Sequence, residues 1–143
     1  MGSREIDIEL CKKFVERGEE DLKSAEILLK HGFFADSTYH SQQAAEKVCK
    51  ALLILENKFV SDHIISGIVS KILDKELAKE IIPTLKSLEE HWIKPRYPFI
   101  GRKLIWDPLK EYTEEIAKDA LEKAKFVVEK IEKILKEKYG IKI

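Results

Sequence analysis

The sequence predicts an all-α fold, an antiparallel up-and-down four-helix bundle with one short accessory helix. Apolar residues recur at steps of three and four along long segments, which is the period of a helix with one buried face. Strand-type alternation is almost absent, and the connection between the first two helical segments is only a few residues long. At 143 residues the chain is expected to form one domain, residues 1–143, around a single core.

The first two helices are predicted as antiparallel neighbours, from about Glu5 to Lys30 and from about Ala35 to Asn57. Gly32 lies where a helix commonly stops. Gly18 interrupts the first helix at a cost of roughly 1 kcal/mol relative to Ala, and we expect a close helix contact there. The neighbouring run Glu19-Glu20-Asp21 is interpreted as a solvated face.

Three further helices complete the expected bundle. Ser61 and Asp62 are candidate N-caps of a short accessory helix that runs to about Leu73. The next helix extends from about Asp74 to Trp92, and Pro83 is expected to kink or split it. Asp107 and Pro108 form an N-cap and first-turn pair, from which the last helix is predicted to continue to the C-terminus.

The second helix carries the most informative pattern of the chain. Its apolar residues cover roughly 200° of the helix, so it should lie centrally and touch several neighbours. The remaining arc is filled by a polar stripe of His40, Gln43, Glu46, Lys47 and Lys50. The stripe could line a groove for a ligand or a partner. The alternative is that it is the solvated side of an amphipathic helix.

The segment from Trp92 to Trp106 is cationic, since it contains Lys94, Arg96, Arg102 and Lys103 and no acidic residue. Arg is scarce elsewhere in the chain, and its planar guanidinium suits bidentate recognition of phosphate or carboxylate. Pro95 and Pro98 are expected to hold Arg96-Tyr97 extended, with aromatic faces free to stack on a base. The alternative is that Trp92, Phe99, Ile100 and Trp106 plug the end of the bundle.

Composition excludes several classes of protein. The formal net charge is zero and the sequence pI about 6.9, so nucleic-acid contact would need a local patch. No segment has the hydropathy of a membrane span, and the N-terminal residues lack the apolar region of a signal peptide. Cys11 and Cys49 lack metal-type spacing and are expected to be buried, reduced thiols of a cytoplasmic protein. No metal site and no cofactor motif is recognised, and the abundance of Lys, Glu and Ile is typical of thermophile proteins.

Four segments together resemble the HEPN superfamily of small archaeal and bacterial helical bundles. The pattern H-x-Q-Q-A-x-E-K-x-x-K-A-L from His40 to Leu52 is similar to the family's second-helix signature, and Asp21–Gly32 resembles the D-L-x-x-A-x-x-L-L segment before it. Asp62-His63-Ile64-Ile65 lies where the family commonly has a His followed by an apolar pair. Arg96-Tyr97-Pro98 resembles the R-Y-P that opens the family's last-helix loop, although Phe99 replaces the usual Asp.

The resemblance implies a binding module more than an enzyme. Ribonucleases of the superfamily use an Arg followed four to six residues later by a His, and no His follows residue 91 here. R-Y-P relatives often accompany minimal nucleotidyltransferases, which implies a toxin–antitoxin-type pair in which this chain binds nucleotide or RNA. The binding candidates are Arg96, Tyr97, Arg102, Lys47, Lys50, His40 and Gln43. The alternatives are an RNA-cleaving toxin with an atypical site and a purely structural or protein-binding bundle. A homodimer is also expected, because the wide apolar arcs exceed what one small bundle needs to bury.

Overall fold

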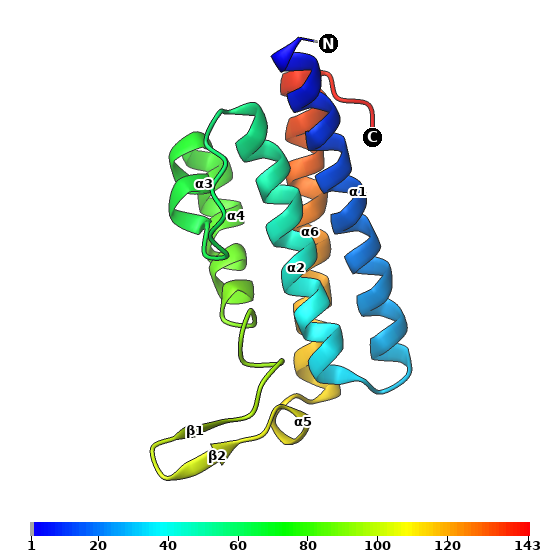
Figure 1. The fold of residues 1–143 in the computed structure, drawn as a ribbon, viewed down its shortest axis with the longest axis vertical. Helices are drawn as coiled ribbons and strands as arrows, with labels where there is room; N and C mark the ends of the chain where they lie inside the picture. The colour runs from blue at the N-terminus through cyan, green and yellow to red at the C-terminus, as the bar shows by residue number, and fades with distance from the viewer. Residues whose placement is uncertain (1) are drawn as a thin grey trace.

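Four long helices form the bundle that the sequence predicts (Figure 1). In the computed structural model, which describes residues 2–143, these helices are α1 (Ser3–Lys30), α2 (Phe34–Leu55), α4 (Lys75–Glu89) and α6 (Glu114–Tyr139). The short helix α3 (Ser66–Ile72) packs beside α4 as the accessory element. None of the helices in residues 2–143 combines the length and hydropathy needed to cross a membrane.

Helix α2 lies at the centre of the bundle, between α1 and α6 (Figure 1). Its apolar side chains from Ala44 to Leu55 are at most about one-twentieth exposed, so its wide apolar arc is covered within a single chain. At Gly18 of α1, an added Cβ would lie 2.6 Å from Cγ2 of Val48. The close contact expected there is therefore confirmed. Cys11 and Cys49 are free and buried, as predicted.

A β-hairpin that the sequence analysis missed protrudes from the lower end of the bundle (Figure 1). Strand β1 (Phe99–Gly101) pairs antiparallel with β2 (Leu104–Trp106) across a two-residue turn. The alternative that Trp92, Phe99, Ile100 and Trp106 plug the bundle end is wrong for Phe99 and Ile100, because their side chains are 41% and 84% exposed.

The last helix does not run unbroken from Pro108. A single turn, α5 (Pro108–Glu111), is followed by a break at Tyr112, and α6 starts afresh with Thr113 as its N-cap. The break inserts the Tyr112 side chain into the core, where its hydroxyl lies 2.8 Å from Nδ1 of His91. Burial raises the pKa of Tyr112 and lowers that of His91.

Three other predicted helix boundaries are corrected. Asn57 has a positive φ of 57°, so α2 ends before it, at Leu55. Helix α3 begins at Ser66 and not near Ser61, because the Glu89 carboxylate accepts hydrogen bonds from the N–H groups of Ile65 and Ser66. Pro83 lies inside α4 without splitting it, and α4 ends at Glu89 and not at Trp92.

Candidate functional site

The polar stripe of α2 is organised around two buried carboxylates. The first is Asp21 of α1, only 3% exposed, whose two oxygens lie 2.9 Å from Nδ1 of His40 and 2.5 Å from Nζ of Lys47. Burial acts to raise the pKa of this carboxyl, but the hydrogen bonds from His40 and Lys47 outweigh it and hold the pKa below its usual value. Asp21 is thus an ionised anchor inside the α1–α2 interface, and its interpretation as a solvated residue was wrong.

The second carboxylate is Glu46 of α2 itself, which is 4% exposed. It accepts a hydrogen bond from Nε2 of Gln42 at 2.9 Å and pairs with Lys50 at 3.2 Å. Nδ1 of His63, from the segment before α3, lies 3.1 Å from the same carboxylate. Gln43 extends the chain of bonds by donating to Gln42 at 2.7 Å. The stripe is therefore largely internal, and the alternative that it is a solvated helix side was wrong.

Each carboxylate fixes the orientation of one imidazole. A His whose Nδ1 bonds a carboxylate keeps its proton there, so in the neutral ring Nε2 is the free acceptor. His40 and His63 are bound in this way and are neither fully buried nor fully exposed. Both rings can therefore offer Nε2 to a ligand.

Arg96 lies among three aromatic rings. Its Cζ is 4.4 Å from the ring centre of Trp92, 4.8 Å from that of Tyr39 and 5.2 Å from that of Tyr97. Its Nε donates to the carbonyl of Trp92 at 2.8 Å. Within residues 2–143 no carboxylate forms an ion pair with Arg96. Its charge is therefore held in place by rings and not neutralised by an acid.

A turn between α4 and β1 delivers Arg96 to this position. The N–H of Arg96 donates to the carbonyl of Ile93, so the expectation that the flanking prolines hold Arg96 in an extended stretch was wrong. Pro95 is buried, and the Trp92 ring stacks on His63 with centres 3.7 Å apart. The turn thus contacts α2 through Tyr39, and it contacts through Trp92 the His63 ring that is bonded to Glu46.

Each of the two histidines contacts one ring of the Arg96 cage. His40 contacts Tyr39 edge to face at 5.5 Å, and His63 stacks on Trp92. A hollow of about 420 Å³, lined by His63 and Trp92 together with residues 61, 62 and 64, opens beside the cage. A fixed cation, aromatic faces and two imidazoles are groups that can hold a phosphate and an attached base.

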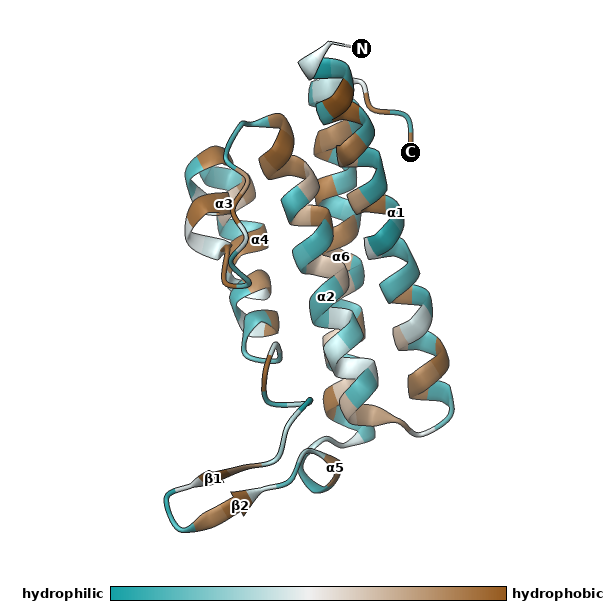
Figure 2. Cartoon of the chain, viewed as in Figure 1, coloured by the Kyte–Doolittle hydropathy of each residue, from teal (hydrophilic) through white to brown (hydrophobic). Residues whose placement is uncertain are grey.

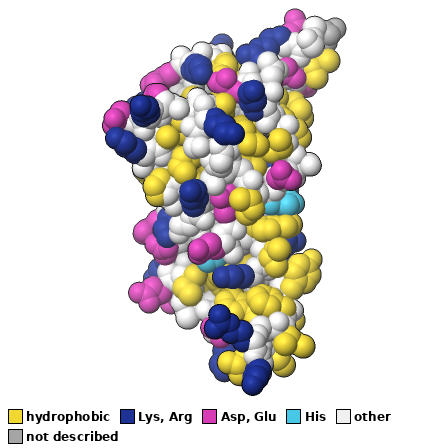
Figure 3. Space-filling model, turned by 90° about the vertical axis from the view of Figure 1, so that its left-hand side faces the viewer, with side chains coloured by type: hydrophobic (Ala, Val, Ile, Leu, Met, Phe, Trp, Pro, Cys, Tyr) yellow, Lys and Arg dark blue, Asp and Glu magenta, His cyan; other side chains and the backbone are white. Residues whose placement is uncertain are grey.

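The other predicted site residues divide into those that join this group and those that do not. Tyr97 borders Arg96 and is 56% exposed, and Lys47 lies beside His40 on Asp21. Gln43 and Lys50 are buried, at 8% and 6% exposure, and bond within the interior. Arg102 is exposed in the hairpin turn between Gly101 and Leu104 and is not among the residues around Arg96. Figure 3 shows basic side chains at the lower end of the molecule.

Sequence reasoning did not assign Tyr39, Asp21 and His63 to the site. Asp21 and His63 do belong to the segments that resemble the HEPN superfamily, which was the available signal. Their contacts with α2 join residues 17 to 26 positions apart, and such pairings depend on the packing of the helices.

Residues 11–134 match the family described as HEPN domain. The chain belongs to this family. It is 44% identical over 147 residues to a protein of Methanocaldococcus jannaschii named "Putative toxin MJ1304", and the match covers 96% of this chain and 95% of that protein.

Two crystal structures share the HEPN bundle. One is TT1696 from Thermus thermophilus, with a TM-score of 0.74, and the other is ST0689, an archaeal HEPN homologue, with a TM-score of 0.70. Both are 23% identical to this HEPN protein and cover 86% of it, with 96% and 95% of their own chains matched. At this identity the likeness concerns the fold.

Proposed function

We propose that this HEPN protein is the toxin-type half of a toxin–antitoxin pair and that it binds a nucleotide or RNA phosphate at Arg96. The observation that carries the proposal is the guanidinium of Arg96, which is caged by three rings and has no carboxylate partner within residues 2–143. A cation held this way keeps its planar fork available for an anion.

The surrounding groups match the rest of a nucleotide. Tyr97 is more than half exposed and adjoins the guanidinium, so a base or a ribose can pack on its ring. His40 and Lys47 lie on the α2 side of the cage and add donors at the Asp21 anchor. Gln43, Lys50 and Glu46 support the site from the interior and do not contact the ligand.

The proposed partner is a minimal nucleotidyltransferase. The support is the named toxin relative at 44% identity, together with the R-Y-P segment at Arg96. An adjacent gene for a small nucleotidyltransferase, and a stable complex when the two products are expressed together, are the expected findings. Failure of the two proteins to associate would leave Arg96 as a ligand site without this partner.

Binding is tested with ATP and with a short single-stranded RNA by calorimetry or fluorescence. Arg96→Ala should weaken binding by about 1–3 kcal/mol, and Arg96→Lys should recover only part of the loss because Lys lacks the planar fork. Arg17→Ala is the matched control, since Arg17 is exposed on α1. Affinity should also fall as salt rises. An affinity that changes neither in Arg96→Ala nor with salt concentration would refute the proposal.

A second candidate is RNA cleavage at the same site, because His40 and His63 are each oriented by a carboxylate and each contact one ring of the Arg96 cage. Such a pair could serve as general base and general acid without a metal. The binding proposal expects no cleavage of mixed RNA in EDTA. Cleavage that disappears in both His40→Gln and His63→Gln would establish the second candidate.

A further inference from the structure

The hairpin of β1 and β2 exposes aliphatic side chains that no other residue of the described range 2–143 covers. Ile100, Leu104 and Ile105 are 84%, 78% and 74% exposed. Figure 2 shows apolar strands leading to a polar tip. An isolated two-stranded ribbon is at best marginally stable in water, and clustered exposed aliphatic residues mark protein contacts. The hairpin is therefore the least self-sufficient part of the molecule.

The hairpin turn is built at a conformational cost. Arg102 and Lys103 have φ values of 47° and 103°, both in the left-handed half of the map. A two-residue turn of this kind normally takes Asn-Gly or Gly-Gly, since other side chains are strained there. Two long cations at this turn indicate that the tip has a charged contact to make.

The two outer edges of the hairpin differ. Strand β1 faces the α4 side of the bundle and is preceded by Pro98, which lacks an N–H donor, whereas β2 forms the side turned away from the bundle (Figure 1). In a two-residue hairpin the closing pair, here Gly101 and Leu104, is hydrogen-bonded and the next pair is not. The N–H and C=O of Ile105 thus point to the free edge of β2.

We propose that β2 pairs antiparallel with β2 of a second copy of this chain, centred on Ile105. This pairing brings the two Ile105 residues opposite each other and sets Leu104 against Trp106 of the second copy. Lys103 of each copy then faces Asp107 of the other. A homodimer was expected from the wide apolar arcs of the sequence, but a single chain covers the arc of α2. The proposed dimer rests on the β2 edge instead.

The partner is a second copy because the β2 edge complements itself. An isologous contact requires each residue to find its match on the same segment related by a two-fold axis, and Lys103–Ile105–Asp107 meets that condition in charge and in spacing. The same operation on β1, centred on Ile100, would set Arg102 against Pro98 and offer no acid to either cation. Charge complementarity therefore selects β2.

The pairing also unites residues that one chain keeps apart. Because the strands run antiparallel, the tip of each hairpin reaches the base of the other. Arg102 of the second copy then lies toward the end of the hairpin where the chain enters from Arg96 and Tyr97. Arg102, which lies in the hairpin turn and outside the Arg96 cage within one chain, would thus approach the ligand site across the dimer.

Cross-linking tests the geometry directly. Opposed residues of a hydrogen-bonded antiparallel pair have Cα atoms about 5.5 Å apart, within disulfide range, whereas Ile100 and its counterpart would be three strand spacings, about 14 Å, apart. Oxidised Ile105→Cys should run as a covalent dimer, and Ile100→Cys should not. The native thiols are buried and do not interfere. Equal cross-linking of the two variants, or cross-linking of Ile100→Cys alone, would overturn the proposal.

Charge variants give a second readout in sedimentation experiments. Wild-type protein should exceed its 16.6 kDa chain mass at micromolar concentration. Lys103→Glu and Asp107→Lys should each weaken self-association about tenfold, while their mixture should dimerise like wild type. Arg102→Glu, which changes the same charge with no acid opposite, is the control. A wild-type monomer, or single variants that associate like wild type, would overturn the proposal. ATP binding measured on the same samples tests the proposed ligand site at Arg96 separately from the dimer.

Discussion

Glu132 of α6 provides the sharpest stability prediction. Its carboxyl lines a cavity of about 310 Å³ between α1 and α6 and faces Glu19 of α1, and its Oε1 is buried without a hydrogen-bond partner. Burial, and then the carboxylate of Glu19, raise the pKa of Glu132 from 4.5 to about 7. Folding therefore favours the protonated form.

The sign and size of the effect follow from this difference in pKa. Below pH 4.5 the folded and unfolded chains both hold the proton, so there is no penalty. Between pH 4.5 and 7 the unfolded chain loses its proton first, and the free energy of unfolding falls as pH rises. The whole difference is worth at most about 3 kcal/mol, and partial solvent contact reduces it to about 1–2 kcal/mol.

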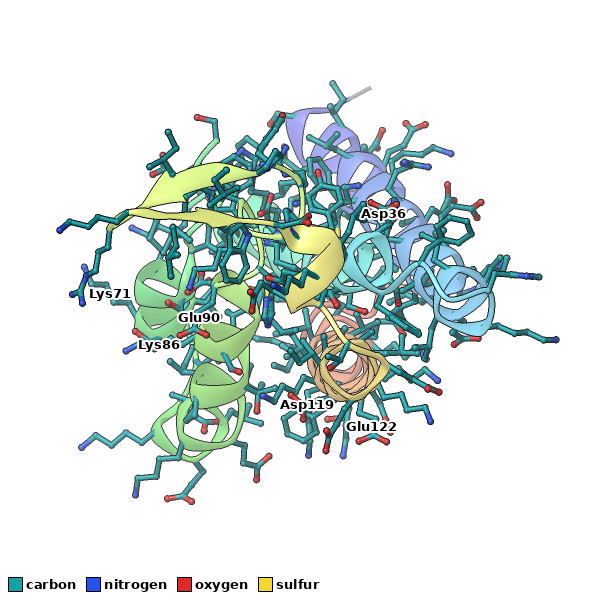
Figure 4. All side chains as sticks on the ribbon, turned by 90° about the horizontal axis from the view of Figure 1, so that it is seen from below. Asp36, Lys71, Lys86, Glu90, Asp119 and Glu122 are labelled. Atoms are coloured by element: carbon teal, nitrogen blue, oxygen red, sulfur yellow. The ribbon has the colours of Figure 1, made fainter. Side chains whose placement is uncertain are left out.

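Glu132→Gln removes the ionisation while keeping the shape of the side chain. Urea denaturation should show variant and wild type nearly equal at pH 4 and the variant more stable by about 1–2 kcal/mol at pH 8. Glu122→Gln is the control, because Glu122 points away from the bundle (Figure 4) and should change stability by less than about 0.5 kcal/mol at either pH. A gain for Glu132→Gln that is the same at both pH values would refute the assigned titration.

Two further predictions concern helix contacts. Gly18→Ala should destabilise the fold by about 1–2 kcal/mol, because the new Cβ would lie 2.6 Å from Cγ2 of the stiff Val48 side chain. This clash outweighs the gain in helix propensity. In a double-mutant cycle measured by denaturation, Gly18→Ala with Val48→Ala should lose less stability than the sum of the two single losses. Glu89→Gln should lower the free energy of unfolding by about 2–3 kcal/mol and speed amide hydrogen exchange at the start of α3. The reason is that the Glu89 carboxylate accepts hydrogen bonds from Ile65 N–H, Ser66 N–H and the Ser66 hydroxyl. Unchanged exchange at the start of α3 would contradict this capping role.

The bundle was predictable because its signals are local. Each long helix carries an apolar period, and Gly18 marked the α1–α2 contact without knowledge of its partner. The hairpin was not predictable in the same way, because its two-residue turn contains Arg102-Lys103 and not a typical turn sequence such as Asn-Gly. The break at Tyr112 also lacked a local signal, since it depends on the core position of that ring beside His91.

The candidate site was predicted in part, for a similar reason. The scarcity of Arg and the acid-free segment indicated Arg96, and the period of α2 indicated His40 and Lys47. What those residues contact depends on packing between distant segments. Asp21 follows two Glu residues that resemble a solvated face, yet its position on α1 turns it into the α2 interface.

The buried charges of α2 are best explained by the orientation that they impose. Well-packed apolar residues in place of buried ion pairs are often as stable or more stable, so Asp21 and Glu46 are not needed for stability alone. Each carboxylate instead fixes Nδ1 of one imidazole, and the rings next to those imidazoles form two sides of the Arg96 cage. Removing Asp21 or Glu46 should therefore free the histidine that it orients and the ring beside that histidine. It should also destabilise the bundle, because the lysine paired with the carboxylate would lose its partner. The interior of α2 and the caged guanidinium thus act as one unit, with the charges inside setting the geometry of the cation nearer the surface.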